Sequence, residues 1–159
     1  MANSTLKGAA MDDAVVEQET GRVPGWYWAV ALAALLFELA GCFFYLVEVK
    51  MSAAEIAALP LDQAAMLAAR PGWYYAAFGI AVWIGLLGAV LLLLRRHWAV
   101  WALLISLVAA VIQFSSVFIV PEMREITPSD ALFVPIVIIV IAYAFWQFSR
   151  LAGRRSWLR

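Results

Sequence analysis

Four uninterrupted apolar stretches constrain this 159-residue chain more than any other feature of its sequence. They cover residues 25–47, 72–94, 98–120 and 131–149, and only the first contains a charged residue. A helix of about 20 residues, rising about 1.5 Å per residue, crosses a hydrocarbon core of about 30 Å. Backbone polar groups in lipid must be satisfied internally, and no stretch alternates with the period of two typical of a barrel strand. The sequence therefore predicts an all-α fold, an integral membrane bundle of four transmembrane helices.

Composition excludes several other classes of protein. Apolar residues make up 66% of the chain and charged residues 14%, against about half and about a quarter in soluble domains. Eleven basic residues balance eleven acidic ones, so no net positive charge favours a nucleic-acid partner. With one cysteine, Cys42, and one histidine, His97, the sequence predicts no disulfide, no metal site and no cofactor. It also lacks a phosphate-binding loop, a nucleophile elbow and paired carboxylates within the spans, and we expect no enzymatic activity.

The distribution of basic residues predicts the orientation in the membrane. Four spans place both termini on one side, together with the turn at 95–97. That side carries eight basic residues and the other side three: Lys7, Arg22, Arg95, Arg96, Arg150, Arg154, Arg155 and Arg159 against Lys50, Arg70 and Arg124. Because basic residues are retained in the cytoplasm, we predict a bacterial inner-membrane protein with both termini cytoplasmic.

The segments outside the spans divide the rest of the chain. Residues 1–24 are polar and predict a cytoplasmic arm, residues 25–150 form the membrane domain, and residues 151–159 form a basic cytoplasmic tail. Between the first two spans, Ser52 and Glu55 have the spacing of a capping box, which predicts a short helix ending near Pro60. A second short helix is expected over 62–70. We expect this helical outer loop to lie on the membrane surface as a lid.

Glu38 is the ionisable residue that the sequence places near the middle of a span. An ionised side chain there costs at least about 2.5 to 3.5 kcal/mol, so Glu38 is expected to face protein or water. Counted from the cytoplasmic ends, Ser106 and Gln113 of the third stretch lie at a similar depth. We therefore predict a hydrogen bond from Glu38 to Gln113 or Ser106. Two interpretations stay open: a neutral acid that joins helices, or a carboxyl that couples to protons or substrate.

Small residues recur every four positions along the second stretch, at Ala77, Ala81, Gly85 and Ala89. Such a stripe lets another helix approach closely. The partner is either a helix of the same chain or a helix of a second protomer.

Several segments resemble a family of small bacterial four-helix membrane proteins that carry a sugar-transporter label without established activity. The matching segments are Leu35–Gly41, Arg70–Trp73, Val82–Gly88, Leu91–Leu94, Arg95–Val100 and Ser106–Leu107. The resemblance covers Trp26 to about Gln113 and implies the same four-helix fold. The family usually has Trp-Asn where this chain has Phe37-Glu38.

A second, weaker similarity is to small multidrug-resistance carriers, which have a first-span glutamate followed three residues later by glycine, as Glu38 and Gly41 are here. Those carriers are shorter and lack a long first outer loop.

Two functions follow from these patterns as hypotheses. The first is a non-enzymatic accessory or structural subunit, embedded in the lipid bilayer and packed against itself or a larger membrane complex. The second is a proton-coupled small-molecule carrier that acts as a dimer, with Glu38 as the coupling carboxyl. The resemblance to multidrug-resistance carriers implies a cationic or aromatic substrate for the second.

Overall fold

The computed structural model describes residues 23–159, except for the side chains of Ser129 and Asp130. Almost all of the predicted arm, residues 1–24, lies outside the described residues. The described elements are α2 (Gly25–Val49), α3 (Ala53–Ala57), α4 (Leu61–Ala69), α5 (Gly72–Leu93), α6 (Ala99–Ile119), α7 (Pro121–Ile126), a 3-10 turn (Ser129–Leu132) and α8 (Phe133–Arg154). The predicted all-α fold is confirmed, and residues 23–159 contain no strand.

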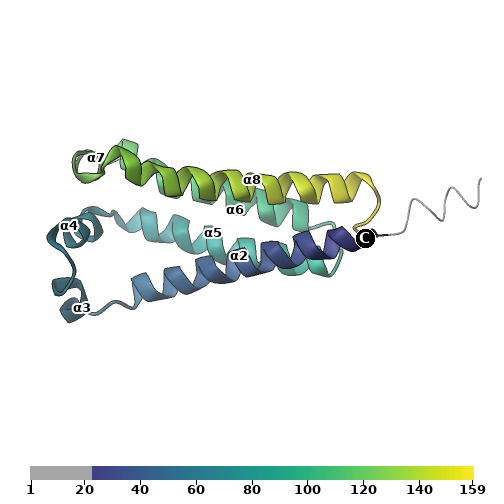
Figure 1. The fold of residues 1–159 in the computed structure, drawn as a ribbon, viewed down its shortest axis with the longest axis horizontal. Helices are drawn as coiled ribbons and strands as arrows, with labels where there is room; N and C mark the ends of the chain where they lie inside the picture. Colours follow the sequence, from purple (N-terminus) through teal and green to yellow (C-terminus); the bar gives the residue numbers. More distant parts are fainter. Residues whose placement is uncertain (1–22) are drawn as a thin grey trace, which may run out of the picture.

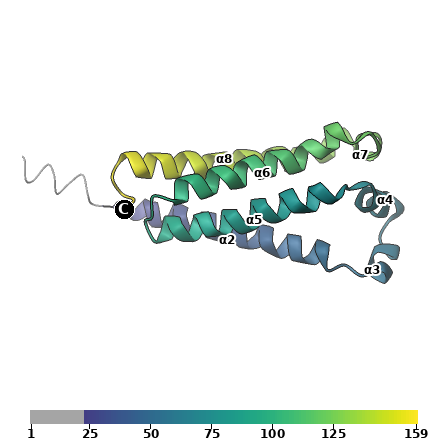
Figure 2. The same ribbon diagram turned by 180° about the vertical axis from the view of Figure 1, so that it is seen from behind.

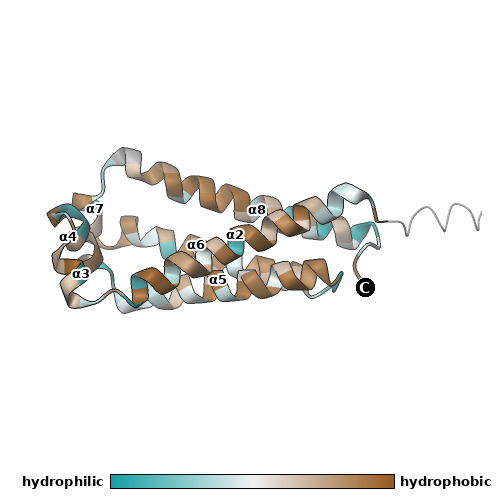
Figure 3. Cartoon of the chain, turned by 60° about the horizontal axis from the view of Figure 1, so that its bottom comes forward, coloured by the Kyte–Doolittle hydropathy of each residue, from teal (hydrophilic) through white to brown (hydrophobic). Residues whose placement is uncertain are grey.

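Four of these helices, α2, α5, α6 and α8, are long and apolar enough to cross a membrane. They run antiparallel in chain order, with α3, α4 and α7 at one end of the bundle and the C-terminus at the other (Figure 1). Apolar residues cover the long helices along most of their length (Figure 3). The chain thus has the architecture of a small multi-pass membrane protein. The bounds of the first three long helices agree with the predicted spans to within two residues, whereas α8 continues five residues beyond 149.

The helices α5 and α6 form the centre of the bundle and pack extensively on one another. On this pair, α2 packs against α5 and α8 packs against α6 (Figure 2). The small-residue stripe lets the neighbouring helices of the same chain approach α5 closely. Its members are all buried within the single chain: Ala77, Ala81, Gly85 and Ala89. The structure therefore uses the stripe for packing inside one protomer.

Local signals set the ends of the elements in the two loops that carry α3, α4 and α7. The predicted capping box is confirmed: the Ser52 backbone N–H donates to Glu55 Oε2 at 2.7 Å, and the Glu55 N–H donates to Ser52 Oγ at 3.3 Å. Pro60 and Pro71 immediately precede α4 and α5, where their fixed φ suits a helix start. The loop between α6 and α8 holds α7, a helix that was not predicted from the sequence, and α7 packs against α4.

The opposite end of the bundle is closed by residues 156–159, which we call the C-terminal clasp. The Arg159 N–H donates to the Arg95 carbonyl at 2.5 Å, and the His97 N–H donates to the Arg159 carbonyl at 3.0 Å. Trp157 is 5% exposed and packs edge-on against Tyr27, with ring centroids 5.9 Å apart. The predicted basic tail, residues 151–159, is thus divided between the last turn of α8 and a segment that is built into the core.

Candidate functional site

Glu38 lies on the face of α2 that is turned into the bundle, and only 5% of it is exposed. The buried residues Ala34 and Cys42 lie one turn before and after it on the same face. Its carboxyl group lies against the backbone of Gly85 on α5, so closely that a Cβ at that position would overlap both carboxyl oxygens. Gly85 therefore provides the space that the Glu38 carboxyl occupies.

The predicted hydrogen bond from Glu38 to Ser106 or Gln113 is wrong. Ser106 Oγ donates to the Ala81 carbonyl at 2.7 Å, and Gln113 Nε2 donates to Tyr74 Oη at 3.1 Å. Both α6 side chains are therefore paired with α5, the helix that packs most closely on α6. Within residues 23–159 the Glu38 carboxyl has no hydrogen-bond partner.

The three residues do, however, line one cavity of about 460 Å³ between the four long helices. Its volume is within the range of about 300 to 1,000 Å³ typical of small-molecule sites. The walls are mainly aliphatic and aromatic, and the polar groups are few. The lining residues are Phe37, Glu38, Ala40, Gly41, Phe44, Glu48, Tyr74, Phe78, Ala81, Val82, Ser106, Ala110, Gln113, Phe114, Val134, Ile138 and Ala142.

The cavity lies in the half of the bundle between Glu38 and the end that carries α3, α4 and α7. Its lining residues come from the second half of α2, the first halves of α5 and α8, and the part of α6 from Ser106 to Phe114. The other half is filled by a core cluster of Tyr27, Ala31, Leu92, Ala99, Leu103, Ala152, Trp157 and Leu158. Tyr27 Oη donates to the Leu92 carbonyl at 2.6 Å, which satisfies the Tyr27 hydroxyl within this cluster. The cavity thus ends at Glu38 on the side of the C-terminal clasp.

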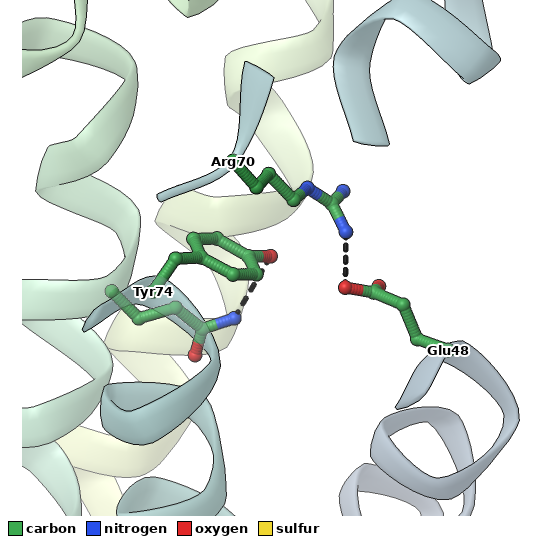
Figure 4. Close-up of polar contacts among 4 residues, drawn as sticks. Glu48, Arg70 and Tyr74 are labelled. Carbon is green, nitrogen blue, oxygen red and sulfur yellow. Dashed lines mark hydrogen bonds and ion pairs between the residues drawn. The ribbon is translucent and has the colours of Figure 1, made fainter. Parts of the chain in front are cut away.

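A polar network stands at the other end of the cavity (Figure 4). Glu48, near the end of α2, forms an ion pair with Arg70, which lies between α4 and α5. The Arg70 guanidinium also lies over the Tyr74 ring, 4.7 Å from its centroid, and Tyr74 in turn accepts the hydrogen bond from Gln113. Burial opposes the charge on Arg70, but the hydrogen bond to Glu48 and the neighbouring Tyr74 raise the pKa of Arg70 above its ordinary value.

Three residues of this network, Glu48, Arg70 and Tyr74, were not predicted from the sequence as site residues. Glu48 follows Glu38 by ten residues, about 15 Å along a helix, a separation that gave no reason to assign both to one cavity. Arg70 lies in a motif of the family resemblance, where it carried no assigned role. Arg70 meets Glu48 only because the 21 residues that follow Val49, up to Arg70, bring the chain back beside the end of α2. No local sequence signal predicts that return.

The described part of the chain contains no group of three or more His, Cys, Asp or Glu side chains that could hold a metal ion. The arrangement is suited to binding instead. The carboxyl of Glu38, which has no hydrogen bond to another described residue, lies at one end of an aromatic-lined cavity, and the carboxyl of Glu48 lies at the other end.

The chain was also compared with models of protein families, with curated proteins and with solved structures, and none of these comparisons found a match.

Proposed function

We propose that this protein binds a small hydrophobic cation in the cavity between its four long helices, and that it carries this cation across the membrane in exchange for a proton on Glu38. The observation that carries the proposal is the Glu38 side chain, which is 5% exposed, lines the cavity and forms no hydrogen bond with another residue of the range 23–159. An isolated carboxylate is costly in this environment, so Glu38 is held neutral by a proton or is paired with a cation.

The exchange balances in charge and atoms. Protonated Glu38 releases its proton to water when the cation binds, and the carboxylate then pairs with the cation. The aromatic rings of Phe37, Phe44 and Phe78 supply apolar contact and ring faces that attract a cation. The few polar groups of the lining offer little to a ligand with many hydroxyl groups, which favours an apolar cation over a sugar.

The structure affects the two functional hypotheses differently. An accessory role through self-packing drew on the small-residue stripe, and that stripe is buried within one chain. The carrier hypothesis assumed a dimer, yet the four long helices of a single chain already line a partly open cavity of about 460 Å³. Binding therefore requires no second copy in this proposal. The location in a bacterial inner membrane, with both termini cytoplasmic, remains part of the proposal on the strength of the basic residues.

Binding of tetraphenylphosphonium, a hydrophobic monocation, to the purified protein tests the proposal. Calorimetry in a weakly buffered solution is expected to show binding with the release of up to one proton per cation. Glu38→Gln is expected to weaken binding roughly tenfold to a hundredfold, since contacts to a charged group contribute about 1.5 to 3 kcal/mol. Glu55→Gln, at an exposed carboxyl on α3, serves as the matched control and is expected to bind like wild type.

Transport is tested with the same variants in proteoliposomes. A proton gradient is expected to drive uptake of the cation by wild type and by Glu55→Gln, and not by Glu38→Gln. The proposal is rejected if wild type does not bind the cation, or if Glu38→Gln binds and transports it as wild type does.

A further inference from the structure

Arg70 contacts the two groups at the end of the cavity away from Glu38 that are best suited to bind a cation, the Glu48 carboxylate and the Tyr74 ring. Its guanidinium forms an ion pair with the Glu48 carboxylate and lies over the ring face of Tyr74. Both Glu48 and Tyr74 line the cavity, and both belong to helices that cross the bundle. A carboxylate beside an aromatic face is the arrangement that attracts organic cations in general.

The Arg70 guanidinium is only partly satisfied by hydrogen bonds at this position. Arg70 lies in the two-residue connection between α4, which ends at Ala69, and α5, which begins at Gly72. Its Nε is buried and has no hydrogen-bond partner, so one of its donors is unsatisfied while the side chain is in place. The side chain keeps some contact with solvent, with 16% of its surface exposed. If the guanidinium moves out of this position, water can hydrogen-bond to its Nε.

We propose that Arg70 is a tethered cation occupying an outer binding subsite made by Glu48 and Tyr74, and that a hydrophobic cation displaces it before reaching Glu38. This inference rests on the proposed function and assigns a second subsite in the same cavity. The displacement exchanges one monovalent cation for another at Glu48, so the charge at the outer subsite does not change. The net release of a proton occurs only at Glu38.

The same ion pair joins α2, through the cavity-lining Glu48, to the connection before α5, and we expect it to act as a latch at this end of the cavity. While Arg70 competes for the subsite, the apparent affinity for an external cation equals the intrinsic affinity multiplied by the fraction of time that the subsite is free. If Arg70 occupies it about 90% of the time, the apparent affinity falls about tenfold.

Tetraphenylphosphonium binding to the purified full chain tests the competition. Arg70→Gln is expected to bind this cation about tenfold more tightly than wild type, whereas Arg70→Lys, which keeps the charge, is expected to remain closer to wild type. The gain is expected to disappear in the double variant Arg70→Gln/Glu48→Gln. Arg124→Gln removes an exposed arginine from α7 and is the matched control. Affinity of Arg70→Gln equal to or below that of wild type overturns the proposal, as does a gain that persists in the double variant.

A second measurement needs no ligand. In a Cys42→Ala background, Ser106→Cys places a nearly isosteric thiol on the cavity wall. Its reaction with a cationic, membrane-impermeant methanethiosulfonate is expected to be faster when Arg70→Gln is added. Glu48→Gln, which also breaks the ion pair, provides the same readout if Arg70→Gln does not fold. Unchanged reaction rates overturn the latch.

The two proposals fail in different ways. Wild-type binding that depends on Glu38 but not on Arg70 removes only the outer subsite. Absence of Glu38-dependent binding rejects the proposed function, even if thiol labelling still shows that the ion pair closes the cavity.

Discussion

The Glu38 carboxyl on α2 rests on the backbone of Gly85 on α5, at a place where any larger residue would contact both of its oxygens. The absence of a side chain at Gly85 thus determines where the carboxyl lies. The neighbouring Gly88 serves a different purpose, because an added Cβ there would meet the backbone nitrogen and side chain of Leu103 on α6.

Gly85→Ala and Gly88→Ala are therefore expected to differ. At Gly85 the obstacle is the far end of a flexible side chain, so the carboxyl moves aside and tetraphenylphosphonium binding weakens with little loss of stability. At Gly88 the obstacle includes backbone, and overpacking of this kind costs about 1 to 3 kcal/mol. Thermal unfolding in detergent, measured beside cation affinity, checks both. Equal losses of stability in the two variants would contradict this distinction.

The C-terminal clasp is expected to contribute strongly to stability. Trp157 is buried among Trp26 and Tyr27, and its backbone carbonyl accepts a hydrogen bond from Arg95 Nε at 2.7 Å. Truncating a buried tryptophan costs about 3 to 5 kcal/mol, so Trp157→Ala is expected to lower the unfolding temperature markedly. Trp98→Ala is the control, since Trp98 is 73% exposed and its replacement is expected to change stability by about 0.5 kcal/mol or less. Similar unfolding temperatures for both variants would show that the clasp adds little.

Ser156 is expected to be a site where glycine stabilises the protein. It follows α8 with a φ of 56°, in the left-handed region, and the Trp157 N–H donates back to the Ala152 carbonyl at 2.9 Å. This is the hydrogen bonding of a helix end that favours glycine, and the left-handed conformation costs other residues about 1 to 2 kcal/mol. Ser156→Gly is therefore expected to gain about 1 kcal/mol in chemical unfolding. Arg155→Gly, at a φ of −88°, is expected to gain nothing, and a gain there as large as at position 156 would count against this explanation.

The cap of α3 is expected to respond to acid. Hydrogen bonds from the Ser52 side chain and backbone hold the pKa of Glu55 below its ordinary value of 4.5. Because the folded pKa is the lower one, the contribution of the cap is fully present above pH 4.5 and is lost as the pH falls through the folded pKa. The amide resonance of Ser52 is expected to titrate with a midpoint below 4.5, and in Glu55→Gln it is expected not to titrate in this range. A midpoint at or above 4.5 in wild type would refute the assignment.

The orientation is tested by labelling introduced cysteines in intact cells. In a Cys42→Ala background, a cysteine at the exposed Ala54 on α3 is expected to react with an impermeant thiol reagent, and a cysteine at the exposed Arg155 is not. The opposite pattern would reverse the orientation while leaving the four-span architecture unchanged.

The sequence by itself determined the four long helices, the capping box at Ser52 and the burial of Glu38 near the middle of a span. These features depend on information within one segment: the length of an apolar run, the spacing of two residues in a first turn, and the cost of a charge in a span. The depth of Ser106 and Gln113 also followed from counting along their helix, and all three residues line the same cavity.

Only the tertiary structure decided which groups meet. Depth along a helix does not specify rotation about its axis or the choice of neighbouring helix, so the partners of Ser106 and Gln113 proved to be Ala81 and Tyr74 on α5. The ion pair of Glu48 with Arg70 and the clasp at Trp157 each join residues more than twenty positions apart. Such contacts depend on how the loops return the chain to the bundle, and the pattern of apolar residues does not specify the path of the loops.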